Sequence, residues 1–260
     1  IAPTWARKFD NGVSIGISPI LAMQLFEARG MGNFAPFSAE PENLTDNSHD
    51  TSYGMGLKFG IQVPMGASAS FGASYQSQMW MSEFDDYAGL FAGQGDFDIP
   101  ASATVGVSVN ASEAWTLAFD VQWIGYSSID SIANPMFPNL MQAPLGSDGG
   151  AGFGWNDMTV YKFGAAWKSS AISTWYFGYS FTDQPIDSSE VMFNILAPGV
   201  VEQHFTTGYT HENASGNSWT VSAMYAPSES VSGINPLDPA QNIKISMDQI
   251  DLEFSYRFGQ

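Results

Sequence analysis

Eleven stretches of the chain alternate apolar and polar residues, and they predict eleven β-strands. In the clearest stretch, Trp115–Ile124, every second residue is large and apolar, which is the period of a strand with one apolar face. The intervening residues are Thr116, Ala118, Asp120 and Gln122. Five similar stretches are Ala67–Met81, Met158–Lys168, Ile172–Phe181, Trp219–Tyr225 and Ile250–Phe258. Weaker strands are expected at Ile1–Phe9, Val13–Phe26, Ser52–Val63, Ala101–Asn110 and Val201–Glu212.

The connections between the predicted strands are short and long in turn. Short turns rich in Asn, Asp, Gly, Ser and Pro are expected at 10–12, 64–66, 110–114, 169–171 and 213–217. Long connections are expected at about 27–51, 82–100, 129–157, 182–200 and 226–245. A β-barrel that crosses a bacterial outer membrane has tight turns on its periplasmic side and long loops outside. The pattern therefore predicts an all-β, antiparallel transmembrane barrel.

The chemistry of the two strand faces separates this barrel from a soluble sandwich, whose strands also alternate. One face is rich in large aromatic side chains, and the other is largely Ser, Thr, Gly and Gln. Only 13% of the residues are charged, against about 25% in average globular domains. A surface that meets lipid needs few charges, so the deficit favours a lipid-facing exterior around a polar lumen. Trp115 and Trp123 would lie roughly 26 Å apart along their strand, near the two aromatic girdles of such a barrel.

Charge and composition exclude several classes of protein. The chain has 8 Lys+Arg, 26 Asp+Glu and no Cys, and its formal net charge is -18. Nucleic-acid binding needs a basic surface, so no nucleic-acid partner is expected. Thiolate metal sites and Cys nucleophiles are excluded, and His49, His204 and His211 lack the spacing of metal ligands. We therefore predict no metal, no cofactor and no catalytic residue, and we do not expect an enzyme.

The strand count is odd, whereas single-chain bacterial barrels have an even number of strands and both ends in the periplasm. The first predicted strand runs into a short turn and the last follows a long loop, so the two ends fall on opposite sides. The sequence opens with Ile1-Ala2-Pro3-Thr4, which is neither an initiator Met nor a signal peptide. We therefore expect an odd number of strands to precede this sequence.

Several motifs resemble those of one family of outer-membrane proteins. They are Asp98–Val107, Trp115–Ser128, Trp155-Asn156-Asp157 before Lys162-Phe163-Gly164, Gly178-Tyr179-Ser180 before Gln184-Pro185-Ile186, and His204–Tyr209. In this order and spacing they resemble the FadL-type transporters of long-chain fatty acids and other hydrophobic compounds, over nearly the whole chain. The resemblance implies a 14-stranded barrel in the outer membrane of a Gram-negative bacterium, with an N-terminal hatch that plugs the lumen. Residues 1–260 would then form a single transmembrane barrel domain that lacks the hatch and the first three strands.

Two of the long connections carry large apolar residues where polar ones are expected. They are Met31, Phe34 and Phe37 in the first, and Phe84, Tyr87, Leu90 and Phe91 in the second. The spacing of Phe84, Tyr87 and Phe91 predicts a short amphipathic helix. The resemblance implies that two such loops form a groove that captures substrate, since burial of an acyl chain gains ~0.8 kcal/mol per methylene. The alternative is that these side chains only pack the loops together. A third apolar run, 191–196, would cap the barrel or contact a partner.

Strand parity places a few charged and polar side chains in the lumen. The main candidates are Asp120, Gln122, Lys162 and His204, with Lys58, Glu202, Glu253 and Arg257 as further members. A lumen cation could pair with a fatty carboxylate. Internal pairing, such as Lys162 with Asp120 on the neighbouring strand, is the favoured interpretation.

The sequence and the resemblance together predict a channel for passive uptake of hydrophobic molecules, either long-chain fatty acids or hydrocarbons. Its expected partners are membrane lipid, lipopolysaccharide and the hydrophobic substrate. The alternative is a structural barrel, used as a lattice or complex subunit, whose apolar loops are contact surfaces. That alternative, unlike the first, requires a stable homo-oligomer or larger complex. A general porin would need a wide open lumen.

Overall fold

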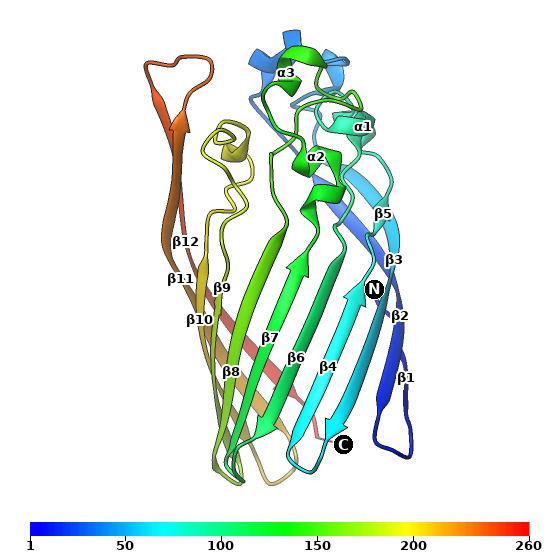
Figure 1. The fold of residues 1–260 in the computed structure, drawn as a ribbon, viewed down its shortest axis with the longest axis vertical. Helices are drawn as coiled ribbons and strands as arrows, with labels where there is room; N and C mark the ends of the chain where they lie inside the picture. Colours follow the sequence, from blue (N-terminus) through cyan, green and yellow to red (C-terminus); the bar gives the residue numbers. More distant parts are fainter. Residues whose placement is uncertain (260) are drawn as a thin grey trace.

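The computed structural model describes residues 1–259, which form one curved antiparallel sheet with its long loops gathered at one end (Figure 1). The strands are β1 (Trp5–Lys8), β2 (Ser14–Phe26), β3 (Asp50–Met65), β4 (Ala69–Gln76), β5 (Trp80–Met81), β6 (Ser102–Asn110), β7 (Trp115–Ile124), β8 (Met158–Ser170), β9 (Ser173–Phe181), β10 (Gln203–Glu212), β11 (Ser218–Ile234) and β12 (Asn242–Arg257).

The 12-stranded sheet has the simplest barrel topology, because each strand pairs with its neighbour in sequence. The order is β1-β2-β3-β4-β6-β7-β8-β9-β10-β11-β12, and the two-residue strand β5 pairs with β3. Every pairing between named strands is antiparallel. Among the described residues, β1 and β12 each pair on one side only. The prediction of an all-β antiparallel barrel sheet of about eleven strands is thus confirmed.

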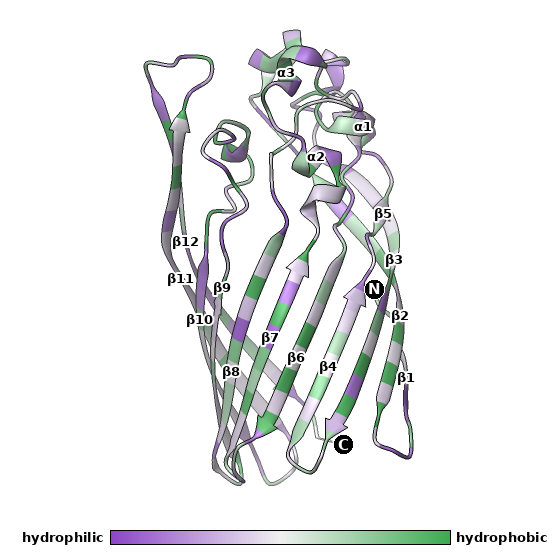
Figure 2. Cartoon of the chain, in the orientation of Figure 1, coloured by the Kyte–Doolittle hydropathy of each residue, from purple (hydrophilic) through white to green (hydrophobic). Residues whose placement is uncertain are grey.

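The outward face of the sheet is apolar, as the alternation predicted. Leu252 is 79% exposed and Phe254 67% exposed on β12, an arrangement that water would penalise and that lipid accepts. Figure 2 shows the bands of alternating hydropathy along the strands. Near the short turns, an aromatic row crosses four strands, with Trp115 opposite Trp167, Trp167 opposite Trp175, and Trp175 opposite Tyr209. This row is where one girdle of a transmembrane barrel is expected.

Two predicted boundaries were wrong. The stretch Ala67–Met81 is not one strand, because the chain bulges at Ser77, whose backbone N–H and Oγ both bond to Leu57, and then continues as β5. The connection expected at 226–245 is only 235–241, because β11 and β12 stay paired past a register shift between Ala226 and Glu229. Pro227 and the Ser-rich residues after it suggested a loop, but Val231 is buried against the neighbouring loop.

The helices are all short and lie in the long loops. The 3-10 helices are η1 (Gly32–Phe37), η2 (Pro41–Asn43), η3 (Asp85–Tyr87), η4 (Tyr126–Ser128) and η5 (Phe193–Ile195), and the α-helices are α1 (Ala92–Gly95), α2 (Asp130–Ala133) and α3 (Asn139–Gln142). Among residues 1–259, none of these helices is long and apolar enough to span a membrane. The amphipathic helix predicted over Phe84–Phe91 is also wrong, because only η3 forms there and Gly93 and Gln94 then turn with positive φ.

Candidate functional site

The long loops share one hydrophobic core, which we call the loop core. Its buried members come from four loops: Ala28, Met31, Leu44, Phe84, Tyr87, Leu90, Phe91, Met136, Leu140, Leu145, Ala151 and Phe193. Phe26, at the outer end of β2, packs against three of its rings, with centroids 4.8 Å from Tyr87, 4.8 Å from Phe91 and 5.7 Å from Phe84. Apolar contact of this kind holds loops together without regular secondary structure.

Hydrogen bonds tie the first two loops to each other at the loop core. The buried Tyr87 hydroxyl donates to the Ser48 carbonyl at 2.6 Å and accepts from the Ala28 N–H at 3.1 Å. The Asn47 amide donates to the carbonyls of Glu42 and Asp86, both at 2.8 Å. The Tyr87 hydroxyl satisfies the buried Ala28 N–H, and together these bonds hold the two loops in one arrangement.

The third and fourth loops are joined by buried polar side chains. Asn194 is fully buried; its amide donates to the carbonyls of Phe153 and Glu190, and its Oδ1 accepts from the Trp155 indole N–H at 2.6 Å. The Glu190 carboxylate is also buried and accepts from the Met136 N–H at 2.7 Å. The run 191–196, expected to cap the barrel or contact a partner, therefore packs onto the other loops through Phe193 and Asn194.

The predicted capture residues are brought together, but inside the loop core rather than on an open groove. Met31, Phe84, Tyr87, Leu90 and Phe91 are buried, and Phe34 and Phe37 are partly buried against them. Phe34 contacts Phe193 of the fourth loop, with ring centroids 5.5 Å apart. The expected packing of the loops on one another is therefore present.

A cavity of about 270 Å³ lies between the loop core and the upper end of the barrel. Its wall is mainly aromatic and aliphatic, and the polar groups that reach it are few. It is lined by Gln24, Phe26, Phe91, Phe97, Asp98, Ile99, Pro100, Tyr126, Ile132, Phe153, Trp155, Leu196 and Ala197. A concave, mostly apolar pocket with a few placed polar groups is the usual form of a small-molecule site.

The polar side chains that line this cavity are Gln24, Asp98, Tyr126 and Trp155. Asp98 is 6% exposed, and its carboxylate accepts from the Gln78 amide and the Met81 N–H, both at 2.6 Å. Next to it, burial and the Asp98 charge raise the pKa of Asp96 to about 6. The Gln24 Oε1 is buried without a hydrogen-bond partner in the described part of the chain. Burial also raises the pKa of the Tyr126 phenol, so its hydroxyl stays protonated at neutral pH.

Sequence reasoning missed most of the cavity wall. Phe97, Tyr126, Ile132, Phe153 and Trp155 were not among the predicted substrate-binding residues, although they lie in or next to the long connections 82–100 and 129–157. The signal that could have found them is the density of aromatic residues in a loop that should face water. Only Phe91 among the predicted capture residues reaches the cavity itself.

Three of the predicted lumen residues, Asp120, Lys162 and His204, fall on one register row across four strands, whereas Gln122 lies opposite Val160. Asp120 on β7 lies opposite Lys162 on β8, Lys162 opposite Ser180 on β9, and Ser180 opposite His204 on β10. The expected Lys162–Asp120 pair is not formed, because the ammonium donates to Gln122 Oε1 at 2.6 Å instead. The Lys162 ammonium is thus hydrogen-bonded to an uncharged side chain on the neighbouring strand.

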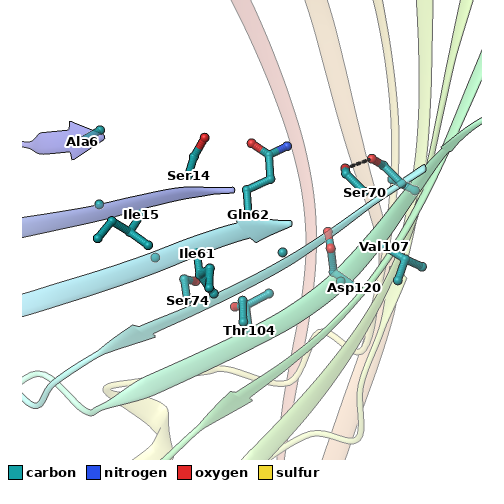
Figure 3. A pocket seen from close by; sticks show the side chains of 17 residues that line it. Ala6, Ser14, Ile15, Ile61, Gln62, Ser70, Ser74, Thr104, Val107 and Asp120 are labelled. Carbon is teal, nitrogen blue, oxygen red and sulfur yellow. Dashed lines mark hydrogen bonds between the residues drawn. The ribbon is translucent and has the colours of Figure 1, made fainter. Parts of the chain in front are cut away.

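Beyond Asp120 the same row continues over small side chains. Gln62, Gly72 and Gly106 lie opposite one another in turn, and with Ser14 and Asp120 they line a hollow of about 470 Å³ on the inner wall. Figure 3 shows Ser14 on β2, Gln62 on the adjacent β3 and Asp120 on β7. The hydroxyls of Ser70 and Ser108 are hydrogen-bonded at 2.8 Å. No group of three or more His, Cys, Asp or Glu among residues 1–259 is arranged to hold a metal ion.

The fold of this chain is similar to that of several solved structures. The solved structures that it resembles include the toluene transporter TodX of Pseudomonas putida (17% identity, TM-score 0.64, 97% of this chain and 67% of that one). Two others are the toluene transporter TbuX of Ralstonia pickettii (14%, 0.59, 99% and 66%) and a Pseudomonas aeruginosa FadL homologue (14%, 0.59, 97% and 66%). The chain therefore spans about two thirds of the length of these structures, and the likeness shows the fold.

Among curated protein sequences, none matches the chain. The sequence model of one family does match, and it covers residues 1–229. Members of this family are transport channels of the Gram-negative outer membrane and not enzymes. The chain belongs to the outer membrane protein transport protein family (OMPP1/FadL/TodX).

Proposed function

We propose that this protein takes up hydrophobic molecules, either hydrocarbons or long-chain fatty acids, by passive passage across the outer membrane. The observation that carries the proposal is the aromatic cavity between the loop core and the polar inner wall. A hydrophobic molecule gains free energy by leaving water for such a cavity, at roughly 25 cal/mol per Å² of apolar surface buried. The names of TodX and TbuX describe toluene transporters, which supports the choice of a hydrophobic substrate.

The seven predicted capture residues act, in this proposal, as the support of the cavity. Phe91 forms part of its wall, and Met31, Phe34, Phe37, Phe84, Tyr87 and Leu90 hold the loops that shape it. Substrate reaches the cavity between the loops and continues toward the lumen face, where Gln24 lies. The lumen residues Asp120, Gln122, Lys162 and His204 keep the inner wall polar, so a hydrophobic molecule is not retained there.

We further propose that additional strands complete the wall between β1 and β12. Unpaired strand edges expose backbone N–H and C=O groups, which lipid cannot satisfy. Three strands and a hatch are the number implied by the family resemblance. In the assembled barrel, the apolar outer face contacts membrane lipid, and the acidic loops face the lipopolysaccharide.

The structural alternative, a lattice or complex subunit, relied on apolar loops as contact surfaces. Most of those side chains are buried or partly buried within the chain itself, and of the run 191–196 only Ile195 and Leu196 are exposed. The uptake channel is therefore the function that the arrangement of the loops supports best.

Uptake of a labelled hydrocarbon by cells that carry the intact protein tests this function. Ala197 lines the cavity, and Ala197→Trp would fill it without removing any existing packing. Ala240 is exposed near the tip of the β11–β12 hairpin, so Ala240→Trp is the matched control. We expect uptake to fall to the level of cells without the protein in the first variant and to stay normal in the second. Equal uptake by both variants and the unmodified protein would contradict the proposal.

A further inference from the structure

Three of the outer loops contain no basic residue. Loops 82–101, 125–157 and 182–202 have no Lys, Arg or His. Their acidic residues are Glu83, Asp85, Asp86, Asp96, Asp98, Asp130, Asp148, Asp157, Asp183, Asp187, Glu190 and Glu202. In loop 27–49, Arg29 and His49 both contact Glu27, so these two cations are already partnered. A molecule that approaches the cavity from outside therefore meets a field of one sign.

The charge on the cavity wall is also negative. None of its lining residues in the described chain is Lys, Arg or His. Asp98 holds a carboxylate there, fixed by its bonds from Gln78 and Met81, and Gln24 adds an unpartnered amide oxygen. The Trp155 N–H that could donate is already used by Asn194. The cavity thus offers acceptors and a negative charge, and the further donors among these lining side chains, the Tyr126 hydroxyl and the Gln24 amide, are uncharged.

We infer that this cavity admits uncharged hydrophobic molecules and excludes carboxylates such as fatty-acid anions. The inference rests on the proposed function, because it names the substrate class of the same cavity. At an effective dielectric constant of about 20, the repulsion between two like unit charges ~12 Å apart weakens the binding constant of a charged ligand about ten-fold. An uncharged aromatic ring meets no such cost, and its electropositive edge is attracted to carboxylate and amide oxygens.

Two ligands of one shape separate charge from size. p-Xylene and p-toluate are both substituted benzenes, and at pH 7.5 only the second is an anion. The intact protein in detergent is labelled at the Ile δ-methyl groups, and each ligand is titrated while the methyl spectrum is recorded. Ile132 lines the cavity, whereas Ile250 is 68% exposed on the outer face and reports ligand dissolved in the micelle.

We expect p-xylene to shift the Ile132 signal, and p-toluate to need at least about ten-fold more ligand for the same shift. Asp98→Asn and Asp96→Asn should each lower the ratio of the p-toluate concentration to the p-xylene concentration that gives the same shift. Asp238→Asn in the distant hairpin should leave this ratio unchanged. Asp96 makes no hydrogen bond to the Gln78 or Met81 groups that Asp98 anchors, so its variant keeps those contacts.

Three results would overturn the inference, and they differ in whether the proposed function would also be contradicted. Equal binding of both ligands removes charge selection and leaves the proposed function standing. A ratio unchanged in both Asp variants shows that these carboxylates do not exclude anions. If neither ligand shifts Ile132 in the unmodified protein, the cavity is not the binding site, and the capture step of the proposed function falls as well.

Discussion

Tyr87 is the residue whose single hydroxyl links two distant points of the first outer loop to the second. Replacing it with Phe keeps the ring in the loop core but leaves the buried Ala28 N–H without an acceptor. We expect a loss of about 1–3 kcal/mol in the local stability of loop 27–49. Hydrogen–deuterium exchange at Ala28 measures it, and Tyr53→Phe on the exposed outer face of β3 is the control. Unchanged protection in Tyr87→Phe would show that the hydroxyl does not hold the loop.

Asp96 gives the second loop a dependence on pH. Burial and the neighbouring Asp98, Glu83 and Asp130 raise its pKa to about 6, above the ordinary value of 3.8. The folded loop therefore keeps a proton that the open loop releases, so the folded loop loses stability as pH rises through about 6. The rate of amide hydrogen–deuterium exchange in residues 82–101, corrected for its intrinsic dependence on pH, should rise between pH 5 and 7.5. In Asp96→Asn the corrected rate should stay constant over this range. The same rise in both proteins would contradict this assignment.

At the residue scale, the sequence predicts which side chains gather but not how deeply they are buried. The apolar residues of loops 27–51 and 82–100 stood out because water-facing loops should be polar. Their contact with Met136, Leu145 and Phe193 depends on loops that are far apart in the sequence and are brought together by the order of the strands in the sheet. Likewise, parity places Lys162 opposite Asp120 correctly, while the choice of Gln122 as its partner is a matter of rotamer.

Among the elements, loop 182–202 is attached to its neighbour by the buried side chains of Asn194 and Glu190. Asn194→Ala removes three hydrogen bonds at once and leaves the Trp155 N–H unpaired. We expect limited proteolysis to cut 182–202 several times faster, since each buried group left unsatisfied costs about 1–3 kcal/mol. Asn139→Ala, which removes one exposed bond to Gly149, is the matched control and should be cut at the original rate. Equal rates for the two variants would disprove the attachment.

The short strand β5 depends on a glycine in β3. A Cβ on Gly54 would overlap the Trp80 carbonyl and the Met81 sulfur, whereas on Gly60 it would have ordinary room, with the Ala73 carbonyl 3.9 Å away. We expect Gly54→Ala to cost about 1–3 kcal/mol and to detach β5, while Gly60→Ala in the same strand stays paired. Exchange at the Ser82 N–H, which donates to the Tyr53 carbonyl of β3, distinguishes the two variants, and protection retained in Gly54→Ala would contradict the prediction.

The strands were predictable because the alternation of apolar and polar residues is visible within each segment. The arrangement of the loops was not, because it depends on contacts between residues far apart in the sequence. Alternation located all the long strands, since a one-residue slip would turn the apolar face inward. The errors lie where tertiary contact overrides composition, as in β11 and β12, where packing of Val231 and Ile245 extends the hairpin through a Ser- and Pro-containing segment.

Over the whole molecule, charge is divided between the two ends. The short turns carry both signs, with Arg7, Lys8, Lys168 and Arg257 beside Asp10, Glu113 and Glu212, while three of the long loops are acidic without a single cation. This division and the aromatic cavity support one account, in which uncharged hydrophobic molecules are captured at the loops and pass toward the lumen.

The central claim of that account is the place where a hydrophobic molecule binds. Crystals of the intact protein soaked with p-bromotoluene test it most directly, because the bromine is located by its anomalous signal. We predict a peak inside the cavity bounded by Phe91, Phe153 and Trp155, and its loss in Ala197→Trp. Bromine found only on the outer face of the strands, with the cavity empty in the unmodified protein, would contradict the account.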